Sequence, residues 1–113
     1  MPTPEELTLK DRIALDAVRI DDYAVMSLED VDLFREADSE ALASLAFNVD
    51  EIGDRPVRKA VTRMFIEHED PTYRQEMADN HCMPRDVLKL LAKCDDPIAA
   101  AYAEMTLEAK EED

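Results

Sequence analysis

Four side chains in this sequence are of the types that bind zinc or iron: His68, His81, Cys82 and Cys94. Zinc sites combine imidazole and thiolate ligands at spacings that let them converge on one ion. His81 and Cys82 are adjacent, and neighbouring residues on a helix point about 100° apart, so this pair could share an ion only from a loop. Cys94 lies twelve residues further on, which matches no recognised zinc motif. We therefore expect a loop histidine beside a free thiol, without a metal or another cofactor.

A second group with chemical potential is the segment Glu67-His68-Glu69-Asp70, which places a histidine among three carboxylates at a predicted helix end. Such a cluster could form a weak cation site, but a solvated helix end is the more common outcome. No serine or cysteine has a recognisable base partner. A chain with one glycine also has no glycine-rich phosphate loop. The sequence gives no positive indication of an enzyme.

Negative charge dominates the chain, which has 28 acidic and 13 basic residues and a formal net charge of −15. A protein of this charge repels nucleic-acid phosphates and anionic membranes and attracts basic proteins. We therefore expect a basic protein or nucleoprotein complex as partner, without direct binding to nucleic acid or membrane. The densest acidic run, and the candidate partner-binding site, is Asp16, Asp21, Asp22, Glu29, Asp30, Asp32, Glu36, Asp38 and Glu40.

Two interpretations of this acidic run remain open. Small acidic proteins that inhibit restriction or CRISPR machinery place carboxylates where their target expects phosphates, and this chain is similar to them in size and charge. It carries no motif that is specific to any of them. The alternative is a solvated surface that serves only solubility, for example in a salt-adapted host.

One basic cluster stands out, formed by Arg55, Arg58, Lys59 and Arg63. Residues three or four apart on a helix are neighbours, so these side chains lie close together. They could pair with the acidic N-terminal half of the same chain. They could equally dock an acidic partner segment or a second copy of the chain, so a homo-oligomer is possible.

The composition favours helices over strands. Glycine occurs once and aromatic residues make up 5% of the chain, whereas sheets depend on glycine-bearing turns and on β-branched or aromatic strands. Alanine, leucine and methionine are strong helix formers and are common here. No apolar run approaches the ~18 residues of a membrane span, and the opening residues do not resemble a signal peptide. We expect one all-α domain, residues 1–113, in the cytoplasm.

Short polar residues and prolines mark the predicted helix starts, because they cap or pre-set the first turn. The first predicted helix is capped by Thr3, begins at Pro4 and ends near Asp21-Asp22. Six further helices are expected to start at Ser27, at Asp38 or Ser39, at Asp54, at Asp70-Pro71, at Met83-Pro84 and at Asp96-Pro97. The expected buried faces include Leu28, Val31 and Phe34; Ala41, Leu42, Leu45 and Ala46; Val57, Ala60, Val61, Met64 and Phe65; and Ile98, Ala101, Tyr102 and Met105.

A pattern of apolar residues occurs twice, in residues 40–64 and 86–105. Leu42 and Leu45 of the first copy match Leu88 and Leu91 of the second, and each copy continues into a helix that follows a proline. Repetition of a helix pair indicates stacked hairpins, an architecture that mainly presents surfaces.

The stretch from Met77-Ala78-Asp79-Asn80 through Pro84-Arg85-Asp86-Val87-Leu88 to Asp96-Pro97-Ile98 resembles the leucine-rich repeat variant family, as does the Val57-Arg58 pair with its surroundings. The resemblance covers residues 38–106 and implies a right-handed α-solenoid of paired helices, related to HEAT and armadillo repeats. Proline spacing is irregular, Ala99 replaces the usual arginine, and the iron–sulfur cysteines of some members are missing. The resemblance therefore bears on the fold and transfers no site.

Together these patterns predict an irregular α-solenoid or small helical bundle of six to seven short helices. Residues 4–36 would cap it, residues 38–106 would form the helical repeats, and residues 107–113 would be a frayed acidic tail. The expected function is non-enzymatic protein binding, in its sharper form an inhibitor that masks the nucleic-acid-binding surface of a target. The alternative is a helical-repeat adaptor whose charge serves only solubility.

Overall fold

The computed structural model describes residues 7–15 and 17–112, and these residues form helices and turns without a strand. The elements are α1 (Leu9–Ala14), α2 (Ile20–Ala24), α3 (Leu28–Phe34), α4 (Ser39–Phe47), the 3-10 helix η2 (Val49–Glu51), α5 (Arg55–Glu67), α6 (Thr72–Ala78), α7 (Arg85–Ala92) and α8 (Pro97–Glu112). The all-α prediction is confirmed. The described part of the chain has eight α-helices, however, where six or seven were expected.

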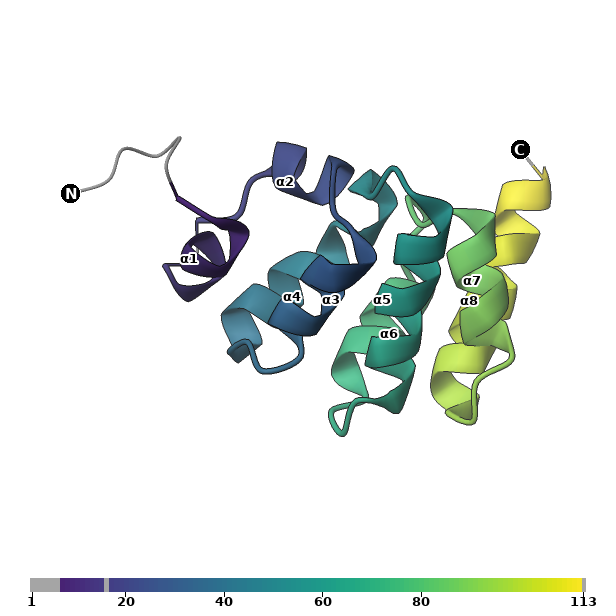
Figure 1. Cartoon of the computed structure of the whole chain (residues 1–113). Helices are drawn as coiled ribbons and strands as arrows, with labels where there is room; N and C mark the ends of the chain where they lie inside the picture. The colour runs from purple at the N-terminus through teal and green to yellow at the C-terminus, as the bar shows by residue number, and fades with distance from the viewer. Residues whose placement is uncertain (1–6, 16, 113) are drawn as a thin grey trace.

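The helices stack in two rows along the molecule, which measures 49 × 30 × 19 Å. In one row α1 contacts α3, α3 contacts α5 and α5 contacts α7, and in the other α4 contacts α6 and α6 contacts α8 (Figure 1). Chain order thus follows the long axis, from α1 at one end to α7 and α8 at the other. A single cluster of buried apolar side chains runs between the rows.

The predicted bounds of the first helix were wrong, because two short helices, α1 and α2, occur where one long helix was expected. Its expected cap and start, Thr3 and Pro4, lie outside the described residues. Within them, α1 begins after Thr8, whose hydroxyl accepts from the amide of Asp11 while the Asp11 carboxylate accepts from the amide of Thr8. This reciprocal capping box fixes a helix start. Asp22 similarly accepts from the amide of Arg19, so a separate helix begins where the first was expected to end.

Most of the later helix starts are confirmed. Ser27 and Asp30 form a capping box at α3, and Asp38 accepts from the amide of Ala41 at α4. Asp96 accepts from two amides at the start of α8. Asp54 occupies the cap position of α5, but its side chain makes no capping hydrogen bond.

The buried face of α8 was predicted wrongly. Ile98 and Met105 are 53% and 64% exposed, and Tyr102 is exposed as well. The face that packs on α6 and α7 instead consists of Ala99, Ala103 and Thr106. Small side chains let two helices approach closely, and apolar residues occur on both sides of α8, so hydrophobicity could not identify the packed side.

Three other expectations differ from the structure. Leu28 was expected inside the core but is exposed at the first turn of α3, whereas Val31 and Phe34 are buried as predicted. Residues 107–112 continue α8 as helix instead of fraying. The two copies of the sequence pattern correspond to α4–α5 and α7–α8, but α4 and α7 lie in different rows, so the structure does not confirm this repeat as a structural unit.

Candidate protein-binding surface

The acidic run predicted as a binding site extends from α2 through α3 and the following turn to the first turn of α4, and much of it has a structural role. Asp16 lies outside the described residues. Asp22, Asp30 and Asp38 cap helices by accepting hydrogen bonds from backbone amides. A carboxylate at a helix N-terminus is stabilised by the unpaired amides and by the helix dipole. These three groups therefore stabilise the fold, and their charge is partly offset there.

Two carboxylates of the run also form ion pairs. Asp22 pairs with Arg12, and both side chains are largely buried. Asp32 pairs with Arg35 at 2.8 Å on the exposed surface of α3. Because one link joins α1 to α2, the acidic run helps to hold the N-terminal helices together.

Four of the exposed carboxylates of the predicted run form no hydrogen bond or ion pair within the described part of the chain: Asp21, Glu29, Glu36 and Glu40. Glu29 lies in the first turn of α3, and Glu36 lies in the turn that follows the last residue of this helix, Phe34. The remaining two flank this helix in sequence, in the first turns of α2 and α4. These four are the groups that could contact a partner without loss of structure.

Exposed apolar side chains lie in the same part of the chain, and the sequence patterns did not reveal them. They are Leu15, Ile20, Val25, Leu28 and Leu33. Val25 is the most exposed of them, at 80%. Leu28 was expected in the core and Ile20 on the apolar stripe of the first predicted helix, and no sequence pattern singled out Leu15, Val25 or Leu33. Apolar anchors surrounded by charge are typical of protein interfaces.

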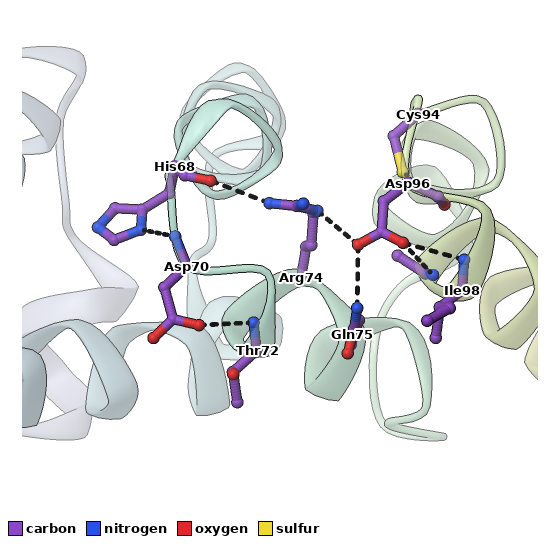
Figure 2. Close-up of polar contacts among 9 residues, drawn as sticks. His68, Asp70, Thr72, Arg74, Gln75, Cys94, Asp96 and Ile98 are labelled. Carbon is purple, nitrogen blue, oxygen red and sulfur yellow. Dashed lines mark hydrogen bonds and ion pairs between the residues drawn. The ribbon is translucent and has the colours of Figure 1, made fainter.

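A largely buried polar network joins α6 to the start of α8 in the second row of helices (Figure 2). Arg74 of α6 donates to the carboxylate of Asp96 at 2.8 Å and to the backbone carbonyl of His68 at 2.9 Å. Gln75 also donates to Asp96. Burial of the Asp96 carboxyl acts to raise its pKa, but the bonds from Gln75, the Ala99 amide and Arg74 together hold that pKa below its usual value.

The first row contains a matching link. Arg58 of α5 donates to Asp86 of α7 at 3.4 Å and to the carbonyl of Ile52 at 2.9 Å. As in the Arg74 network, an arginine near the start of one helix reaches a carboxylate near the start of the next helix in its row. Arg58, which the sequence grouped with a basic cluster, thus serves the interior of the fold.

The histidine and cysteine positions show no metal-binding geometry. Nδ1 of His68 accepts from the amide of Asp70, and its ring packs edge-on against Tyr73. Cys82 is exposed in the turn after α6, and Cys94 is a half-buried free thiol. Over the described ranges, no three ligand side chains gather around one point.

No family model, no curated protein and no solved structure matches the chain. In the described part of the chain, no helix has both the length and the apolar character that crossing a membrane requires. What bears on function is therefore the set of exposed carboxylates and apolar side chains of α2–α4.

Proposed function

We propose that this chain is a non-enzymatic binding module whose α2–α4 surface docks on a basic protein or nucleoprotein complex in the cytoplasm. In the sharper form of the proposal, docking masks a surface that the target uses for nucleic acid. The supporting observation is the set of four exposed carboxylates between Asp21 and Glu40 that have no hydrogen-bond or ion-pair partner among the described residues. Such a surface is attracted to a cationic one over roughly a Debye length, about 8 Å at physiological salt.

The helical-repeat adaptor is the second candidate, and the exposed apolar residues of the same helices favour it. A partner held through Ile20, Val25 and Leu28 would bury apolar area, which salt does not weaken. Charged groups at the rim of such an interface mainly affect the association rate. The two candidates thus share a surface and differ in which side chains supply the binding energy.

Affinity capture from host lysate at low salt, followed by a salt gradient and mass spectrometry, tests the proposal and identifies the target. We expect one basic nucleic-acid-binding protein or complex to elute at moderate salt. A partner that remains bound at high salt would support the adaptor instead. If nothing is retained, the surface serves only solubility and the binding proposal fails.

A pair of variants then locates the contact on the protein. The first variant neutralises the four unpaired carboxylates: Asp21→Asn, Glu29→Gln, Glu36→Gln and Glu40→Gln. The control neutralises four exposed carboxylates elsewhere and changes net charge equally: Glu67→Gln, Glu76→Gln, Glu104→Gln and Glu108→Gln. We expect the first variant to bind at least about fourfold more weakly, since exposed ion pairs contribute about 0.2–1 kcal/mol each and four of them contribute about 0.8 kcal/mol or more.

The control should bind nearly as well as the original chain. Equal loss in both variants would show that only total charge matters and would contradict a defined contact surface. Capping residues such as Asp30 are left intact, so both variants should retain their helical circular dichroism. The set Ile20→Gln, Val25→Gln and Leu28→Gln tests the adaptor, which predicts that these changes weaken binding more than the acidic variant does.

A further inference from the structure

Helices α5 and α7 are neighbours in the first row (Figure 1). Their side chains line a basic groove. Its volume is about 420 Å³. Its lining consists of Arg55 and Lys59 from α5 and of Arg85, Asp86, Lys89, Leu90 and Lys93 from α7 and its C-terminal cap. Five cationic side chains therefore surround one carboxylate in a chain that is otherwise strongly acidic.

The positive charge of the groove is mostly unpaired. Asp86 is already held by Arg58 at 3.4 Å, with Arg55 at 3.9 Å. Within the described residues, Lys59, Lys89 and Lys93 form no ion pair. The groove consequently keeps an excess of positive charge that the abundant carboxylates of the chain do not neutralise.

The spacing of these cations follows the helix. Arg85, Lys89 and Lys93 are four residues apart, so they project from one side of α7 about 6 Å from each other along the axis. Like charges at this spacing repel one another and destabilise the helix. The helix dipole favours the charges of Lys89 and Lys93 at the C-terminal end of α7, and an anionic ligand lying along the groove would in addition relieve the repulsion between the cations. Leu90 is half-buried in the groove and offers an apolar contact beside the cations.

We propose that this groove binds an acidic peptide segment of another protein, with carboxylates about one helical turn apart and an apolar side chain that contacts Leu90. A peptide brings only a few charges, whereas a nucleic acid would extend its phosphates over the surrounding acidic surface and be repelled. A second copy of the chain, with a net charge of −15, would be repelled in the same way. This site lies on other helices than the α2–α4 surface and does not depend on its function.

The test is a titration of the full-length ¹⁵N-labelled protein, followed by NMR, with a synthetic alanine-based helical peptide. The peptide carries glutamates at positions i, i+4 and i+8 and a leucine between them, and its control carries glutamines in place of the glutamates. We expect the acidic peptide to shift the signals of α5 and α7, and the glutamine peptide to bind at least tenfold more weakly. The double variant Lys89→Gln/Lys93→Gln should lower the affinity of the acidic peptide at least tenfold.

The matched control is Lys10→Gln/Arg63→Gln, which removes two exposed cations outside the groove and should leave affinity unchanged within twofold. Equal weakening in both double variants, or no binding of the acidic peptide, would overturn the proposal. Tighter binding of pyrophosphate or a ten-nucleotide oligothymidylate in the groove would assign it to phosphates instead. Concentration-dependent shifts of α5 and α7 without peptide, lost in the groove variant, would assign it to a second copy.

Discussion

Substitution of Asp96 by asparagine is the sharpest test of how the second row of helices is held together. Asp96 lies between α6 and α8, and its side chain is 7% exposed. One of its oxygens accepts from the amides of Ile98 and Ala99, and the other accepts from Arg74 and Gln75. Asparagine can keep the first oxygen as an acceptor and cap α8 almost as well. The second oxygen is replaced by an NH₂ group, which can only donate. The side-chain donors of Arg74 and Gln75 then point at another donor and lose their acceptor.

The expected cost follows from what is lost at that second position. A hydrogen bond to a charged group contributes about 1.5–3 kcal/mol, and removing one partner of a buried ion pair costs about 3–5 kcal/mol. Arg74 retains its bond to the carbonyl of His68 and is 16% exposed, so water can partly solvate it. We therefore expect Asp96→Asn to lower the free energy of unfolding by about 3 kcal/mol, or roughly 12 °C in Tm.

Urea unfolding monitored by circular dichroism at 222 nm measures this change. The matched control is Asp70→Asn, because Asp70 accepts from the amide of Thr72 at the start of α6 but is exposed. The control keeps the same kind of cap and should cost much less. If Asp96→Asn unfolds within about 0.5 kcal/mol of the original chain, as an ordinary surface substitution does, the network does not stabilise the fold and this reasoning is refuted.

The same variant has a defined pH dependence. The folded-state pKa of Asp96 lies below its ordinary value of 3.8. A carboxyl group of this kind stabilises the folded state above its unfolded pKa, and the contribution is lost as pH falls through the folded pKa. The stability difference between the original chain and Asp96→Asn should thus be constant from about pH 7 to 5 and shrink below about pH 4. A difference that grows on acidification would contradict the assignment.

Three further outcomes can be checked on the isolated protein. Thr106→Val should cost about 1–3 kcal/mol in urea unfolding, because the buried Thr106 hydroxyl donates to the carbonyl of Ala78 at 2.7 Å, whereas Thr106→Ser keeps that donor and should cost less. Phe65→Ala should lower the free energy of unfolding by about 3–5 kcal/mol because it leaves a cavity in the core. The same change at the exposed Phe47 should lower it by less than about 1 kcal/mol. Similar losses in the two variants would place Phe65 outside the core. Cys82 should react with a thiol reagent before Cys94, because Cys82 is exposed and the Cys94 thiol is half-buried against the carbonyl of Asp96. Mass spectrometry gives the order of modification, and the reverse order would contradict the structure at the start of α8.

The helix starts were the most predictable part of the fold, because caps are local. Ser27, Asp38 and Asp96 each precede a helix that their side chain caps, and the bonds involved span three residues or fewer. The Thr8–Asp11 capping box is just as local, but it lies inside the longer apolar pattern from which the first helix was predicted. A local cap can divide an apolar pattern into separate helices, which is how the expected first helix became two.

The packed side of α8 and the basic groove could not be derived in the same way. Both sides of α8 carry apolar residues, and the choice between Ala99 and Ile98 depends on how closely α6 and α7 approach. In the groove, Arg55 and Lys59 were recognised as part of a basic cluster, but their proximity to Lys89 and Lys93 depends on the packing of α5 against α7. Contacts between helices distant in sequence carry no local pattern.

The structure also changes what the acidic composition says about function. Asp22, Asp30, Asp38, Asp86 and Asp96 contribute a third of the chain's fifteen aspartates, and each has a cap or a cationic partner within the fold. Their charge is needed for helix starts and for links between helices whether or not a partner binds. Evidence for a binding role therefore comes only from the carboxylates without such a partner. A variant that removes capping carboxylates would destabilise the fold by about 0.5–2 kcal/mol per cap, and that loss would be confused with a loss of binding. The four unpaired groups of α2–α4 are therefore the ones to change.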